Sequence, residues 1–435
     1  MKTLRKLLFP EFELRVTLIS YLSNFLAGVI MIKSFTHLMK PSEYGKLGLV
    51  SSISSLLITT LISPFMQGAS RYYLNSAPLL SFKYVENFLN KILITISIVT
   101  LFSIFYFIYK SNFLDSVILL LLLITVIIDT RGQWYTSFLH LNRKRIEYTI
   151  STSIFNWLKI VIALILILLF PKFSAIIFVL IGWIISSYIS NIYSKNRLSI
   201  LNNDFKNSIN HHTEKSLDTK SLKVFVVNFV ILNIFLWIQG WADKWILNYN
   251  FGESSELGIY ISHNQVAMIP FVALNGLIIM YYGPIIYQKI ASNSHAINLN
   301  EIRIKINQLK NYYLFFSFFL IIILFYLTPF ILKLLLNNQY PIDRQIFFLC
   351  SLSSLLFNYS QIQSFSIQCT GKLKNILLPN IYIGILLVIV NLFFSKQYGI
   401  LGSLLILNLM MFLKIVILNY YEKKSWFLFM NSSII

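Results

Sequence analysis

A single lysine stands in the middle of a long apolar segment of the chain. Lys159 lies eleven residues from either end of segment 148–170. Asn156, Thr152 and Thr149 precede it at spacings of three, four and three residues, so all share one helical face. Inserting a lysine at the centre of a membrane helix costs roughly 3 kcal/mol. We therefore expect either a cation that meets an anionic or hydroxyl-rich substrate in a cavity, or a structural lysine paired with an acid.

Two charges interrupt the preceding apolar segment, 113–138. Asp129 and Arg131 are two residues apart, so they point to different helical faces and cannot simply neutralise each other. Asp129 could pair with Lys159 on the neighbouring helix, or it could take a proton or sodium ion. Arg131 could meet an anion, or its long side chain could extend toward the basic loop at 143–145.

An aromatic and charged face closes segment 222–247. Trp237, Trp241 and Lys244 follow one another at spacings of four and three residues, and Asp243 stands beside the lysine. Indole rings stack on sugar rings, and the lysine could meet an anionic group. The alternative is that these tryptophans lie at the membrane–water interface and that the lysine extends its ammonium into water.

Further candidates are isolated polar residues in or beside apolar segments. They are Arg15, Lys33, Arg71, His263, Asn264, Asn358, Gln361 and Lys414. Arg15 and Arg71 could receive an anion on the cytoplasmic side or be ordinary cytoplasmic charges. For the others, helix packing or structural pairing is the alternative to a substrate contact.

Composition places these residues in a membrane. The 435-residue chain is 57% hydrophobic and 12% charged, whereas soluble domains are about 25% charged. Its apolar segments are long enough to form helices that cross a hydrocarbon core of about 30 Å. We predict an all-α integral membrane protein with twelve transmembrane helices. The expected spans are 14–37, 46–66, 87–109, 113–138, 148–170, 174–194, 222–247, 257–282, 312–336, 344–367, 375–394 and 398–420.

Positive charge predicts the orientation. With a cytoplasmic N-terminus, and with charges near the ends of a span counted with the adjoining side, 25 of the 36 Lys and Arg are cytoplasmic, eight are on the outer side and three lie deep within helices. This bias predicts that both termini are cytoplasmic. The net charge of +20 then reflects topology rather than nucleic-acid binding. The two cysteines, Cys350 and Cys369, have no partners at metal-ligand spacing, so we expect free thiols and no metal site.

A repeated element divides the chain. KSFTHLMKPSEYG at 33–45 and KWILNYNFGESSELG at 244–258 each join a lysine to a polar turn and Glu-x-Gly. Residues 195–221 are polar and lack periodicity. We predict an N-terminal six-helix lobe at 1–194, a cytoplasmic linker at 195–221 and a C-terminal six-helix lobe at 222–435. Duplicated bundles of this kind are typical of transporters with a site between two halves.

The order of several short motifs resembles a known family. PSEYGKLGLV follows the first expected helix, WADKWILNYNFGESSELGIY ends the seventh, and YGILGS opens the last. Together they resemble the polysaccharide transporters of the MOP (multidrug, oligosaccharidyl-lipid, polysaccharide) exporter superfamily, which include the O-antigen repeat-unit flippases. The resemblance implies two lobes around a central cavity, and flipping of an undecaprenyl-diphosphate-linked oligosaccharide across the bacterial inner membrane.

Other functions fit less well. A drug/cation antiporter of this superfamily would favour acids in the first helix, which carries Arg15 and Lys33 instead. A lipid-linked peptidoglycan precursor flippase is harder to separate, although it should have two further spans. A membrane polymerase or another enzyme would need a long outer loop, and the expected outer loops are short. We therefore expect no catalytic residues and no cofactor beyond a coupling proton or sodium ion. A polysaccharide polymerase and a chain-length regulator are the expected protein partners.

Overall fold

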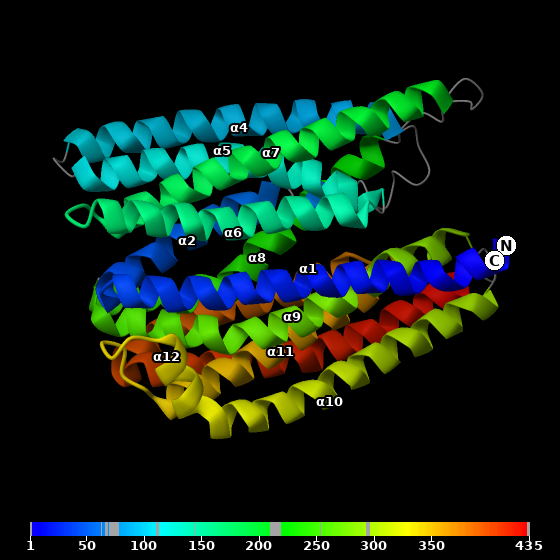
Figure 1. The fold of residues 1–435 in the computed structure, drawn as a ribbon. Helices are drawn as coiled ribbons and strands as arrows, with labels where there is room; N and C mark the ends of the chain where they lie inside the picture. The colour runs from blue at the N-terminus through cyan, green and yellow to red at the C-terminus, as the bar shows by residue number, and fades with distance from the viewer. Residues whose placement is uncertain are drawn as a thin grey trace. The chain divides into compact units, whose positions relative to one another are not determined.

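The computed structural model describes residues 2–61, 63–65, 68, 78–109, 113–142, 144–208, 219–252, 254–292 and 296–432. Within these ranges the regular elements are long helices (Figure 1). They are α1 (Lys2–Leu38), α2 (Pro41–Leu61), α4 (Pro78–Tyr109), α5 (Phe113–Leu141), α6 (Arg145–Leu169), α7 (Ala175–Ser208), α8 (Thr219–Phe251), α9 (Ser255–Ser292), α10 (Ala296–Leu335), α11 (Arg344–Cys369) and α12 (Lys374–Ser432).

Nine of the described helices are long and apolar enough to cross a membrane, so the expected count of twelve is not confirmed. The expected third span appears as a shorter apolar stretch, Leu89–Phe102. The expected tenth span is α11, whose many Ser and Gln side chains lower its hydropathy. The eleventh and twelfth expected spans are joined in α12, which is interrupted by non-helical dihedral angles at Gly399, with φ at 59°.

The segment expected to be a linker is partly helical. Helix α7 continues through 195–208. Hydropathy marks where a helix lies in hydrocarbon, whereas the backbone hydrogen bonds continue into water. Residues 209–218, with His211 and His212, lie outside the described ranges.

The chain forms two compact units. The first unit contains residues 1–27 and 50–233, and the second contains 28–49 and 234–435. Helices α1, α2 and α8 therefore each contribute to both units. The predicted lobes 1–194 and 222–435 and the linker 195–221 remain a prediction.

In the first unit, α7 packs against both α5 and α6 (Figure 1). A buried hydroxyl cluster joins these three helices. Ser151 Oγ lies 2.8 Å from Ser190 Oγ and 2.6 Å from Ser194 Oγ, and Thr136 Oγ1 lies 3.2 Å from Ser151 Oγ. Small hydroxyl residues let membrane helices approach closely and bond across the interface. The cluster fixes the rotation of α6, and hence the direction of its polar face.

In the second unit, α11 packs against α9, α10 and α12. Asp343 caps the start of α11 by accepting hydrogen bonds from the backbone N–H groups of Gln345 and Ile346, at 2.8 and 3.0 Å. A buried ion pair joins α10 to α12, with Lys310 Nζ 2.7 Å from Glu422 Oε1. Helix α11 is thereby held at the centre of this unit.

The two Glu-x-Gly elements lie in the first turns of α2 and α9, and they touch. A Cβ atom placed on Gly45 would lie 3.1 Å from the backbone nitrogen of Gly258. A Cβ atom on Gly258 would lie only 1.6 Å from the carbonyl oxygen of Pro41. The repeated glycines are therefore the point at which two equivalent helix starts cross within the second unit.

Candidate functional site

A half-exposed polar face lies between α1 and α6 in the first unit. Asn156 Nδ2 donates to Asn24 Oδ1 at 2.8 Å, and the indole nitrogen of Trp157 donates to Ser23 Oγ at 3.0 Å. Ser153 Oγ lies 3.3 Å from the same serine hydroxyl. All five side chains keep part of their surface accessible. We call these residues, with Lys159, the α1–α6 face.

Lys159 lies on this face, one helical turn from Asn156. Its Nζ stands 4.8 Å from the centroid of the Phe155 ring, and the residue is only partly buried. Its ammonium forms no ion pair with Asp129 on α5 in the described first unit, so the pairing that the sequence left open remains a prediction.

Asp129 also has partners of its own. Gln133 Nε2 donates to one carboxylate oxygen at 3.2 Å, and Ser187 Oγ on α7 donates to the other at 3.4 Å. Asp129 thus has two hydrogen-bond partners other than Lys159.

The remaining first-unit candidates lie apart from this face or bond locally. Thr152 Oγ1 donates to the carbonyl of Tyr148 in its own helix at 3.0 Å. Arg131 is exposed and reaches Asn90 Oδ1 at 3.5 Å. Arg15 is exposed on α1, and Arg71 lies outside the described residues.

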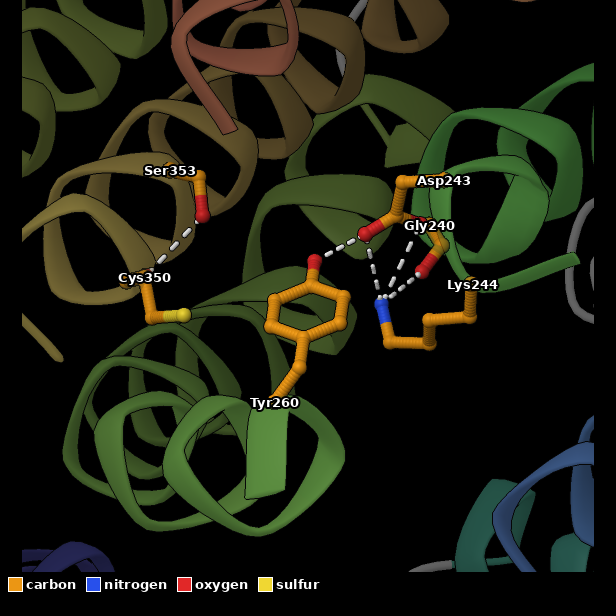
Figure 2. Close-up of polar contacts among 6 residues, drawn as sticks. All are labelled: Gly240, Asp243, Lys244, Tyr260, Cys350 and Ser353. Atoms are coloured by element: carbon orange, nitrogen blue, oxygen red, sulfur yellow. Dashed lines mark hydrogen bonds and ion pairs between the residues drawn. The ribbon is translucent and has the colours of Figure 1, made fainter. Parts of the chain in front are cut away.

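A buried ion pair marks the end of α8 in the second unit (Figure 2). Lys244 Nζ lies 3.1 Å from Asp243 Oδ2 and donates to the Gly240 carbonyl at 3.0 Å. The hydroxyl of Tyr260 on α9 donates to the same carboxylate oxygen. The side chains of Asp243 and Lys244 are 0% and 4% exposed, so this pair is enclosed in the described conformation.

Aromatic rings surround this lysine. Its ammonium lies 5.2 Å from the Trp241 ring centroid and 5.3 Å from that of Tyr260, distances suited to cation–π attraction. Trp237 is half-buried on the same helix. Lys33, expected to be the counterpart of Lys244 in the first half, is exposed. The two repeats therefore place their lysines in different surroundings.

The other second-unit candidates are mostly buried. His263 Nδ1 donates to the Ile259 carbonyl at 2.8 Å, and its Nε2 accepts from the backbone N–H of Asp343 at 3.3 Å. Asn358 Oδ1 accepts from Asn275 Nδ2 at 3.0 Å. Asn264 is buried on α9. Gln361 on α11 is half-buried. The bonds of His263 and Asn358 tie α9 to α11 and to Asp343, which precedes α11.

Lys414 is enclosed in α12 with 0% exposure. Its Nζ donates to Gln239 Oε1 on α8 at 2.7 Å and lies 5.3 Å from the Phe357 ring centroid on α11. In this conformation no surface of the lysine is open to a ligand.

Exposure separates the two groups of candidates. The α1–α6 face combines a cation, amide groups and an indole ring that remain accessible, whereas Lys244 and Lys414 of the second unit are enclosed. Sequence reasoning missed Ser23, Asn24 and Trp157, although the adjacent Ser-Asn pair in the apolar run 14–37 was a usable signal. It also missed Gln239, which accepts a hydrogen bond from Lys414, and Tyr260, which donates one to Asp243.

Comparison with known proteins finds the fold but no close relative. No family model and no curated protein matches the chain. The solved structure described as the lipid II flippase MurJ, inward closed conformation, is 14% identical, covers 97% of this chain and 90% of its own, and superposes with a TM-score of 0.67.

Two further solved structures have a similar fold. A multidrug resistance MATE family transporter of the MOP superfamily, in an inward-facing conformation, is 10% identical over 95% of this chain and 98% of its own, with a TM-score of 0.64. A MOP superfamily transporter from Pyrococcus furiosus, whose title describes a binding pocket of reversed polarity, is 10% identical over 95% and 94%, with a TM-score of 0.63. The chain therefore has the fold of these transporters, and nine of its described helices are long and apolar enough to cross a membrane.

Proposed function

We propose that this chain is a flippase that moves an undecaprenyl-diphosphate-linked oligosaccharide across the bacterial inner membrane by alternating access. The observation that carries the proposal is the α1–α6 face, where Lys159, the Asn24–Asn156 pair and Trp157 are accessible together. Such a substrate presents an anionic diphosphate, a hydroxyl-rich glycan and an apolar tail. A cation can bind the diphosphate, amides can bond hydroxyls, and an indole can stack on a sugar ring.

The positive charges of the first expected helix favour an anionic substrate. Segment 14–37 carries Arg15 and Lys33 and no acid, whereas a site for cationic drugs would favour acidic side chains. Arg15, Lys33, Arg71 and Arg131 remain candidates for the path of the anionic group. This charge pattern supports a lipid-linked substrate over the drug substrates named for the multidrug neighbour.

A lipid-linked peptidoglycan precursor is the second candidate substrate. The fold similarity to a lipid II flippase extends over 97% of this chain and favours this alternative specifically. Both candidates share the diphosphate and the polyprenyl tail, so Lys159 would serve either. They differ in the glycan, which the amide and indole groups of the α1–α6 face would contact.

The orientation and the partners follow from the same proposal. The bias of Lys and Arg places both termini in the cytoplasm, so loading would occur on that side. A polysaccharide polymerase and a chain-length regulator would receive the flipped unit on the outer side. A proton or sodium gradient would supply the driving force, with Asp129 and Asp243 as the acidic candidates for coupling or for structural pairing.

Deleting the gene distinguishes these functions. We expect a deletion strain to lose surface polysaccharide and to accumulate complete lipid-linked repeat units on the cytoplasmic face, measured by mass spectrometry of extracted lipids. Accumulated lipid-linked peptidoglycan precursor would instead support the second candidate. Single repeat units accumulating on the outer face would indicate a polymerase and contradict the proposal.

A further inference from the structure

Three lysines are buried in the described part of the second unit, and one of them has no acid. Lys244 pairs with Asp243, and Lys310 pairs with Glu422. Lys414 has no carboxylate within ion-pair distance among the described residues. Since an ammonium is costly to bury without an anion, Lys414 calls for a different explanation from the other two.

The hydrogen bonds around Lys414 are few and well defined. Gln239 Nε2 donates to the Asn380 carbonyl at 2.9 Å, which turns Gln239 Oε1 toward Lys414 Nζ. Buried Met410 and Leu418 lie one turn before and after the lysine on α12. The surroundings thus offer one neutral oxygen and one ring face. An ammonium has three N–H donors, so the site satisfies a neutral amine more fully than a charged one.

The charged groups on the adjoining helices are engaged elsewhere. On α8, Asp243 and Lys244 bind each other, and on α12, Glu422 binds Lys310. Arg344 on α11 is exposed, as is Lys396 on α12.

We propose that Lys414 is an exchangeable proton site of the transporter, gaining and losing one proton in each cycle. The amine lone pair takes a proton from water on one side of the membrane, forming an ammonium, and the same N–H bond breaks when the proton passes to water on the other side. Gln239 accepts an N–H in either state and positions the amine. This inference rests on the proposed transport function and adds to it a proton-coupled step at a lysine.

Proton binding can be measured without any substrate. The purified protein and its Lys414→Met variant are titrated in detergent, and the number of bound protons is compared. We expect the two curves to differ by one proton at pH values below about 10.4, where ordinary lysines titrate. The Lys396→Met variant on the same helix changes an exposed lysine and should match the unmodified protein in that range. Identical curves for Lys414→Met and the unmodified protein in that range would overturn the proposal.

A second variant covers the case in which Lys414→Met does not fold. Gln239→Glu places a carboxylate on the lysine's own partner and should keep the ammonium charged. We expect this variant not to release the proton that the unmodified protein releases. We also expect a pH gradient across vesicles not to accelerate its transport. A gradient response equal to that of the unmodified protein would contradict the inference. Transport by the unmodified protein at equal rates with and without a gradient would also overturn it, while leaving the flippase function intact.

Discussion

Replacing Lys159 with Ala is expected to slow transport strongly while leaving the amount of protein unchanged. Lys159 supplies the cation of the α1–α6 face, and a charge-assisted hydrogen bond contributes about 1.5–3 kcal/mol. Its loss should lower the rate about 10- to 100-fold, since each 1.4 kcal/mol is a factor of ten. Complementation of a deletion strain, together with protein quantification in the membrane, measures both effects.

Three further variants separate substrate binding from structural pairing. Lys159→Arg keeps the charge and should retain most activity, and Lys172→Ala removes an exposed lysine beyond the end of α6 as a control. If Lys159 serves only to balance Asp129, Lys159→Ala should lose protein, and adding Asp129→Asn should restore both protein and activity. Full activity of Lys159→Ala would contradict its place in the substrate site.

Replacing Gly258 with Ala is expected to destabilise the second unit strongly. The new methyl group would lie 1.6 Å from the carbonyl oxygen of Pro41, a backbone atom that cannot turn away. Overpacking typically costs about 1–3 kcal/mol and occasionally more, and this contact belongs at the upper end. The midpoint of thermal unfolding in detergent measures the loss.

Two glycines give a graded control for this contact. A Cβ atom on Gly45 would lie 3.1 Å from Gly258, so Gly45→Ala should cost less than Gly258→Ala. Gly240 lies in α8 with nothing within 4 Å of an added Cβ, so Gly240→Ala should be neutral or stabilise by up to about 1 kcal/mol. Equal unfolding midpoints for all three variants would show that α2 and α9 do not cross at these glycines.

Hydropathy predicted the bounds of α5 and α6 to within a few residues. The segment predicted at 113–138 is α5, Phe113–Leu141, and that at 148–170 is α6, Arg145–Leu169. The same reasoning failed at 195–208, where a polar sequence remains helical. Near Gly399, the break expected between 375–394 and 398–420 corresponds to the non-helical dihedral angles inside α12.

The contacts of the candidate site were harder to predict than its residues. Periodicity placed Asn156 and Lys159 on one face, but it could not show that this face meets Asn24 on α1, which depends on how the helices are rotated. Likewise, a spacing of 213 residues identified two equivalent Glu-x-Gly elements. Equivalence gives no information on contact, and only the structure shows that Gly45 and Gly258 meet.

Reconstituted transport tests the central claim most directly. Lipid-linked oligosaccharide extracted from the deletion strain is placed in vesicles, and its appearance in the opposite leaflet is followed with a glycan-specific enzyme added outside. We predict that the enzyme reaches the lipid-linked oligosaccharide of the inner leaflet rapidly when the unmodified protein is present. With Lys159→Ala or without protein, we predict that it does so slowly. If the lipid-linked oligosaccharide stays in its original leaflet when the unmodified, folded protein is present, with a pH or sodium gradient imposed in either direction, the chain does not flip this substrate.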